Sequence, residues 1–155
     1  MSMIDKLPPS LRDYIKNDGS SVADGYIRFL VANEIEEVRR IVEKSEMWQG
    51  GIPFATTVFG DVLSWENGYI MLYKFTDEDY TVMLSGTDFF FANLKDEEYR
   101  KDFLDMDLYY ASIEKMGEIS ADECYTLEPI PRIGGARDIK YVNIGKMKEY
   151  LMLLV

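Results

Sequence analysis

The chain has 155 residues, a length typical of one compact domain. Its composition, 47% hydrophobic and 29% charged, is that of a soluble globular protein and excludes disordered and collagen-like chains. The 17 basic residues against 28 acidic ones give a net charge of -11, a field that opposes nucleic-acid backbones and anionic membrane surfaces. We therefore expect no direct nucleic-acid partner and no membrane partner.

Two residue types limit the chemistry further. The chain has no histidine, which excludes Ser/His/Asp and Cys/His catalysis and every metal site that needs an imidazole. The single cysteine, Cys124, cannot form an internal disulfide. The first residues carry no signal-peptide pattern, and no apolar run approaches the roughly 20 residues of a membrane span. We expect a cytoplasmic protein.

The first fifty residues predict two helices and a strand. Ser10 is placed to cap a short helix over Leu11–Lys16, and Tyr26–Val31 has the composition of a strand. Asn33 begins a capping-box pattern for a second helix that runs to about Met47. The apolar face of this helix comprises Ile35, Val38, Ile41 and Val42.

The middle of the chain predicts an antiparallel meander between Ile52 and Leu84. The segment is rich in β-branched and aromatic residues and is broken by Asn67-Gly68 and by an acidic turn. The predicted strands include Val58–Trp65, Tyr69–Phe75 and Tyr80–Leu84. An Asn-Gly pair between apolar runs is typical of a two-residue hairpin turn.

Short helices follow from Asp88 onward. Asp96 is placed to cap one helix and Asp107 another, which would end at Gly117. Two extended pieces, around Cys124–Pro129 and Lys140–Val142, are separated by a glycine pair.

Asn143 is placed to cap a final amphipathic helix. Its apolar residues are Ile144, Met147, Tyr150, Leu151 and Leu154. Together these elements predict an α+β fold, an antiparallel sheet of about four to six strands flanked by helices, as a single domain over residues 1–155.

The negative charge is concentrated in one segment. Residues 51–129 hold 17 acidic and 5 basic side chains, a balance of -12, whereas residues 1–50 balance to -2 and residues 130–155 to +3. The acidic side chains that stand closest together are Asp77, Glu78, Asp79, Asp96, Glu97, Glu98, Asp102, Asp105 and Asp107. They form either a solvated face or a docking surface for a basic partner, whose association such a field accelerates.

The sequence gives only weak support for metal binding, cofactor binding or hydrolysis. The carboxylates of 77–79 and 105–107 lack the spacing of a calcium loop, so we expect no metal. Gly134-Gly135 lacks the rest of a dinucleotide fingerprint and fits a tight turn, so we expect no cofactor. Asp61 and Glu66 could serve as a carboxylate pair, which keeps a carboxylate-dependent hydrolase open as an alternative.

Several separated fragments together resemble a known family. The N-terminal ones are Asp24-Gly25-Tyr26, Asn33-Glu34-Ile35 and the run from Ile52-Pro53-Phe54 to Phe59-Gly60-Asp61. The later ones are Phe89-Phe90, Phe103-Leu104, Gly117-Glu118-Ile119, Asp122-Glu123-Cys124-Tyr125, Glu128-Pro129 and Gly134-Gly135. In this order they resemble the GAD-like region of bacterial immunity proteins, including those that guard against type VI secretion DNase toxins, followed by the C-terminal domain of those proteins. Residues 1–50 would be the GAD-like part, and residues 51–155 the sheet and C-terminal helices on a shared core.

The resemblance implies a protein without catalytic activity that binds and neutralises a cognate toxin by occlusion, with a basic nuclease as a candidate partner. The nine clustered acidic residues would then contact the toxin. The shared motif residues would be structural; they are Gly25, Phe59, Gly60, Asp61, Trp65, Tyr125, Pro129, Gly134 and Gly135. A regulatory or ligand-binding domain remains the other alternative, and a large apolar pocket would mark it.

Overall fold

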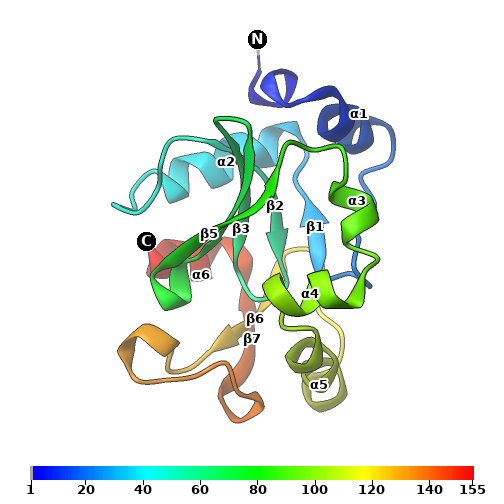
Figure 1. The fold of residues 1–155 in the computed structure, drawn as a ribbon. Coiled ribbons are helices and arrows are strands. Elements are labelled where there is room, and N and C mark those ends of the chain that lie inside the picture. Colours follow the sequence, from blue (N-terminus) through cyan, green and yellow to red (C-terminus); the bar gives the residue numbers. More distant parts are fainter. Residues whose placement is uncertain (1) are drawn as a thin grey trace.

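The computed structural model describes residues 2–155 (Figure 1). Its α-helices are α1 (Pro9–Asn17), α2 (Ala32–Val42), α3 (Phe90–Asn93), α4 (Glu97–Phe103), α5 (Met106–Met116) and α6 (Met147–Leu154). Its strands are β1 (Ile27–Phe29), β2 (Ile52–Thr57), β3 (Val62–Glu66), β4 (Tyr69–Lys74), β5 (Asp79–Ser85), β6 (Glu123–Leu127) and β7 (Val142–Lys146). Short 3₁₀ turns are η1 (Met3–Lys6), η2 (Phe75–Asp77), η3 (Pro131–Ile133) and η4 (Ile139–Tyr141).

The strands form two antiparallel sheets. Five of them make a meander in the order β1-β2-β3-β4-β5, and β6 and β7 make a separate two-stranded sheet. The predicted α+β class is therefore confirmed. So is the Asn-Gly turn, because Glu66 pairs with Tyr69 across two residues of positive φ, 51° at Asn67 and 86° at Gly68.

Helices cover both faces of the five-stranded sheet. Figure 1 shows α2 and α6 on one side and α3 on the other. On the α3 side the Phe54 ring of β2 packs edge-on against Phe90, with ring centroids 6.0 Å apart. Tyr14 of α1 extends this cluster by packing against Phe29 and Phe91. Because it is covered on both sides, β2 buries its side chains almost completely, and one hydrophobic core spans the chain from Ile4 to Leu154.

The predicted apolar face of α2 is confirmed, since all four of its apolar side chains are buried. The bounds of the helix differ from the predicted ones. The Glu34 carboxylate accepts the Val31 backbone N–H at 3.1 Å, so the helix begins at Ala32 and Asn33 lies inside its first turn. It ends at Val42 instead of Met47.

Three other predictions for the first 65 residues need correction. The segment 58–65 is not one strand, because Gly60 has a φ of 81° and residues 58–61 form the turn between β2 and β3. Strand β1 covers only Ile27–Phe29 of the expected six residues. Helix α1 begins at Pro9, and the Ser10 hydroxyl donates to Thr87 Oγ1 at 2.6 Å instead of capping the helix.

For the C-terminal helices, some predictions are confirmed and others need correction. The Asp96 carboxylate caps α4 by accepting the Glu98 N–H at 3.0 Å, and α5 ends at Gly117, whose φ is 83°, as predicted. Asp105 occupies the N-cap position of α5, which places Asp107 within the first turn. Asn143 pairs with Thr126 inside β7, so α6 begins later, at Met147.

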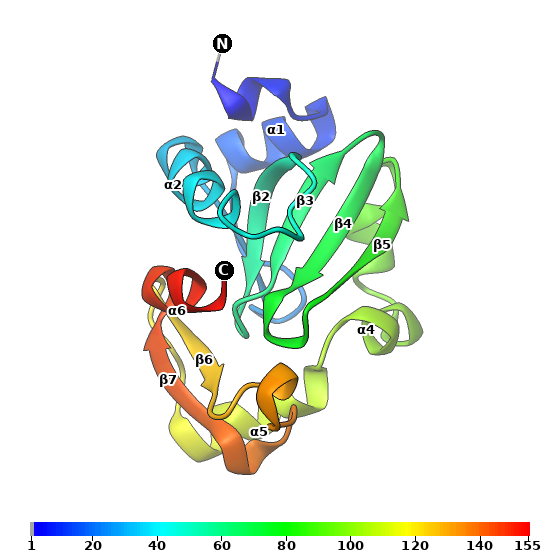
Figure 2. The same ribbon diagram turned by 90° about the vertical axis from the view of Figure 1, so that its left-hand side faces the viewer.

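The small sheet is attached to the large one through the turn between β2 and β3. The Tyr125 N–H donates to the Val58 carbonyl at 2.7 Å, and the Tyr125 ring is buried against Phe59 and Tyr109. Figure 2 shows the β6–β7 hairpin and α5 below the large sheet, with α6 between the hairpin and α2. This junction brings the segment before β7 close to the acidic turns of the middle of the chain.

Candidate functional site

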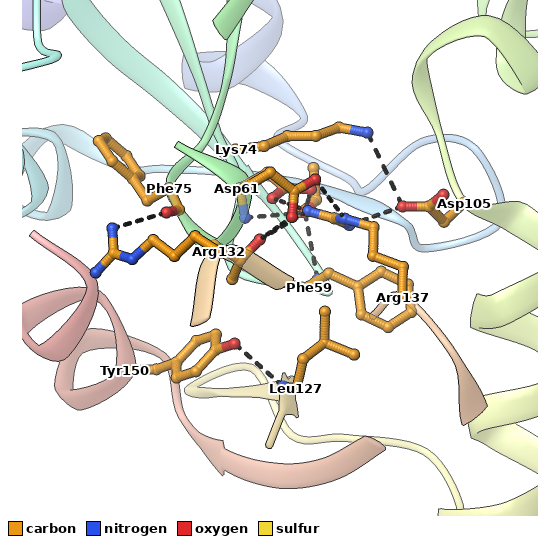
Figure 3. A network of polar contacts seen from close by, with 12 residues as sticks. Phe59, Asp61, Lys74, Phe75, Asp105, Leu127, Arg132, Arg137 and Tyr150 are labelled. Atoms are coloured by element: carbon orange, nitrogen blue, oxygen red, sulfur yellow. Dashed lines mark hydrogen bonds and ion pairs between the residues drawn. The ribbon is translucent and has the colours of Figure 1, made fainter. Parts of the chain in front are cut away.

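One arginine gathers three carboxylates at the junction. The Arg137 guanidinium lies 3.0 Å from Asp61, 3.1 Å from Asp77 and 2.7 Å from Asp105, each measured between the nearest nitrogen and oxygen atoms (Figure 3). A fourth hydrogen bond runs from Arg137 to the Thr76 hydroxyl at 3.0 Å. The Arg137 side chain is only 13% exposed. We call these five residues the Arg137 network.

Each carboxylate of the network comes from a different connection of the fold. Asp61 closes the β2–β3 turn, where it is buried and also accepts the Thr57 hydroxyl at 3.0 Å. Asp77 lies in η2 between β4 and β5, and Asp105 lies between α4 and α5. The network therefore ties the segment before β7 to both the large sheet and the helices.

The loop that carries Arg137 depends on its glycine pair. Gly134 has a φ of 106°, which favours glycine. At Gly135 a Cβ atom would lie 1.7 Å from the Pro129 carbonyl oxygen, so no side chain fits there. The Gly135 N–H donates to the Ile130 carbonyl at 3.0 Å and closes the loop. These contacts fix the position from which Arg137 reaches its partners.

The Arg137 network contains more carboxylates than cations. Desolvation raises the pKa of the Asp61 carboxyl, and the nearby Arg137 and Lys74 offset this only in part. Burial alone would lower the pKa of Arg137, but Asp61, Asp105 and Asp77 outweigh burial and raise it. Lys74 adds a second cation, 3.9 Å from Asp105. Three carboxylates share these cations, so the network retains negative character and keeps Arg137 charged.

A groove of about 700 Å³ opens beside the network. It lies between α4, α5 and the segment before β7; its charged lining residues are Glu97, Arg100, Lys101, Asp105, Asp107, Arg137 and Asp138. Apolar side chains such as Leu104 and Leu108 complete the lining. Charged side chains of both signs and apolar side chains line the groove together, so it differs from the predominantly apolar pocket expected of a ligand-binding domain.

The structure separates the nine predicted acidic residues into two groups. Asp77 and Asp105 are partly buried and bound to Arg137, which makes them internal partners. The other seven are exposed on η2–β5, α4 and the start of α5; they are Glu78, Asp79, Asp96, Glu97, Glu98, Asp102 and Asp107. Of these, Glu97 and Asp107 line the groove, and Glu98 forms an exposed pair with Lys101 at 3.6 Å. We call these seven residues the acidic surface.

The predicted motif residues lie mostly at close contacts. A Cβ at Gly25 would lie 2.8 Å from the Tyr109 hydroxyl, and one at Gly60 would lie 2.9 Å from the Tyr150 ring. Phe59 and Tyr125 are fully buried, whereas Trp65 is half-buried on β3. Pro129 follows a cis peptide bond, and Gly134 and Gly135 shape the Arg137 loop.

Sequence reasoning missed Arg137. The available signals were the positive balance of residues 130–155 and the position of Arg137 two residues after the glycine pair. Neither signal distinguishes a buried arginine from an exposed one, because its carboxylate partners lie 32 to 76 residues away along the chain.

The side chains considered for catalysis can be located among the described residues. Residues 2–155 contain no group of three or more His, Cys, Asp and Glu side chains arranged to hold a metal. The Cys124 thiol is buried, and desolvation raises its pKa to about 12. Asp61 faces Arg137, whereas Glu66 accepts hydrogen bonds from Tyr73 at 2.8 Å and Ser64 at 2.9 Å. The two carboxylates of the hydrolase alternative therefore belong to separate networks.

Comparison with solved structures finds a protein of similar fold. The crystal structure of Atu4351 from Agrobacterium tumefaciens matches with a TM-score of 0.70 over 97% of this chain and 76% of that chain, at 15% sequence identity. This likeness establishes a shared α+β architecture. No helix within residues 2–155 is long and apolar enough to cross a membrane.

Sequence comparison finds a family match for the C-terminal part of the chain. Residues 84–155 match the family described as "T6SS immunity protein Tdi1, C-terminal". The match begins at the end of β5 and includes α4, α5, the hairpin and α6. It confirms the predicted resemblance to type VI secretion immunity proteins over this part of the chain. No curated protein matches the chain.

Proposed function

We propose that this chain is an immunity protein of a type VI secretion system that binds a cognate toxin and neutralises it without catalysis. The match of residues 84–155 to the Tdi1 C-terminal family is the observation that carries the proposal. The buried thiol and the internal role of Asp61 support a binding protein over an enzyme. We place its action in the cytoplasm, where it would meet a toxin with an intracellular target.

The proposed partner is a basic protein, with a nuclease as the candidate. A net charge of -11 creates a field that attracts cationic surfaces and speeds their encounter. The acidic surface contributes to this field, and the family-matched segment contains five of its seven residues. Asp77 and Asp105 are left out of the proposed contact surface, because both are partly buried and already paired with Arg137.

Neutralisation would act by occlusion. A bound immunity protein of this charge would cover the cationic surface with which a nuclease holds its substrate, so the toxin could no longer engage nucleic acid. Occlusion requires one immunity protein for each toxin molecule. An immunity protein that modified the toxin as an enzyme would instead protect at a small fraction of the toxin concentration.

Co-expression with the protein encoded by the neighbouring gene, taken as the candidate toxin, tests the proposal. We expect a stable one-to-one complex on gel filtration, protection of cells only near equimolar expression, and weaker binding as salt is raised. A matched experiment with an unrelated type VI toxin measures specificity. Protection at a tenth of the toxin concentration would favour an enzyme, and the absence of any complex at low salt would refute the proposed function.

A further inference from the structure

A second, apolar groove is lined by none of the seven residues of the acidic surface. It has a volume of about 460 Å³ and is bordered by the β6–β7 hairpin, η3 and α6. Leu153, 81% exposed, and Ile133, 70% exposed, lie on its borders and are the most exposed large apolar side chains of the described residues. Ile130, Ile144 and Pro129 add to its lining. Exposed apolar side chains gathered around one concave site are typical of protein contact surfaces.

The floor of this groove is held in place by buried contacts. Leu127 and Leu154 are buried, and the Leu127 N–H donates to the Tyr150 hydroxyl at 3.1 Å, as Figure 3 shows. The η3 border is fixed by Arg132, whose guanidinium donates to the Phe75 carbonyl at 3.0 Å. The groove is therefore formed before a partner arrives, which lowers the entropy lost on binding.

The charges at the groove favour a basic occupant. Glu128 and Glu149 both line it, and neither forms an ion pair within residues 2–155. The nearby Lys146 is already paired with Asp122 at 2.9 Å. A second copy of this chain would bring the same two carboxylates and another net charge of -11 to the interface. A partner that presents lysine or arginine beside an apolar side chain fits both features.

We propose that this groove anchors the cognate toxin by taking an apolar side chain that is flanked by a basic residue. The inference rests on the proposed function and assigns the main contact to a surface that charge alone does not indicate. Every residue that lines the groove lies within the family-matched segment 84–155. The acidic surface would steer the encounter, and the groove would set the lifetime of the complex.

Two groove variants and one matched control test the anchor. Leu153→Asp and Ile133→Asp place a charge at the groove, while Met152→Asp makes the same change at a 55% exposed neighbour on α6 that does not line it. Dissociation constants are measured against an inactivated form of the candidate toxin used in the co-expression test. We expect the groove variants to weaken binding at least about 30-fold, mainly through faster dissociation, and the control to stay within about twofold. Thermal unfolding checks that all three variants remain folded.

The outcomes separate the two proposals. If the wild-type chain binds the toxin and the groove variants bind as tightly as Met152→Asp, the groove is refuted while the proposed function stands. If the wild-type chain does not bind the toxin, the proposed function is refuted, and the proposal that the groove anchors the toxin is refuted with it. If the wild-type chain is a dimer in the absence of toxin and Leu153→Asp is a monomer, the occupant is a second copy and the anchor is refuted.

Discussion

The five-stranded sheet and the C-terminal hairpin both contain buried strands, but the hairpin also depends on polar contacts for its attachment. In the sheet, β2 buries five of its six residues and β4 four of six, between layers of helices. In the hairpin, β6 buries four of its five residues and β7 buries only Val142, and polar contacts join the hairpin region to the sheet, among them Arg137 with Asp61 and Tyr125 with Val58. The sheet should therefore tolerate conservative apolar changes, whereas loss of one of these polar contacts should disturb the hairpin region that carries the proposed groove.

Removing Arg137 should give the largest effect on stability. Arg137→Met leaves Asp61 buried without its cation, and breaking a buried pair in this way costs about 3 to 5 kcal/mol. Urea unfolding measures the loss. Arg132→Met is the matched control, because it removes one hydrogen bond from the same loop, to the Phe75 carbonyl, and should cost about 1 kcal/mol. Equal losses for the two variants would show that the network does not hold the hairpin.

The loss from Arg137→Met should depend on pH. Because burial raises the pKa of Asp61 in the folded chain, the folded state binds this proton more tightly than the unfolded state does. Ionisation of Asp61 therefore costs stability as pH rises through its folded pKa, and Arg137 offsets this cost. Removing Arg137 raises that pKa further, so the variant should lose most at neutral pH and approach the wild type as acid protonates Asp61. A constant difference from neutral to acid pH would mean that Asp61 is not the residue left unpaired.

The glycine pair gives the next effect. Gly135→Ala would place a Cβ 1.7 Å from the Pro129 carbonyl oxygen, so the loop must move and up to about 3 kcal/mol is lost. Gly134→Ala meets nothing within 4 Å and loses only about 1 kcal/mol for its positive φ. Chemical denaturation of both variants gives the comparison. A smaller loss at Gly135 than at Gly134 would contradict the close approach of the two backbone segments.

Some of this architecture could be predicted from the sequence. The Asn67-Gly68 turn, the apolar face of α2, the Asp96 cap and the Gly117 stop all depend on residues within a few positions of one another. Their local chemistry decides their structure.

The missed features depend on partners distant in the chain. Asn143 has a suitable side chain for a helix cap, yet pairing with Thr126 of β6 draws it into a strand. Arg137 resembles any surface arginine until the fold brings Asp61, 76 residues earlier, beside it. The groove beside Leu153 likewise needs the hairpin and α6 together. The Arg137 network and the groove therefore depend on tertiary structure. Of the candidate functional features, only the charge of the acidic surface could be predicted from the sequence.

The hydroxyl of Tyr150 should contribute less than Gly135 to stability. It accepts the buried Leu127 N–H, so Tyr150→Phe leaves that N–H without a partner at a cost of about 1 to 2 kcal/mol. Tyr80→Phe is the control, since that ring is 42% exposed and should lose almost nothing. Hydrogen exchange of the Leu127 amide provides a direct measurement. Unchanged protection in Tyr150→Phe would refute the role given to this bond in holding the groove floor.

The smallest effects on stability should come from the acidic surface, and here binding and folding separate. Asp79→Lys changes an exposed carboxylate and should leave the urea midpoint nearly unchanged while slowing association with the toxin at low salt. Asp77→Lys, two residues earlier, replaces a partner of Arg137 with another cation and should lower the urea midpoint clearly. The two variants carry the same charge change, so a difference in stability cannot come from net charge. Equal urea midpoints would place Asp77 outside the network, and equal association rates for Asp79→Lys and the wild type would remove η2–β5 from the steering surface.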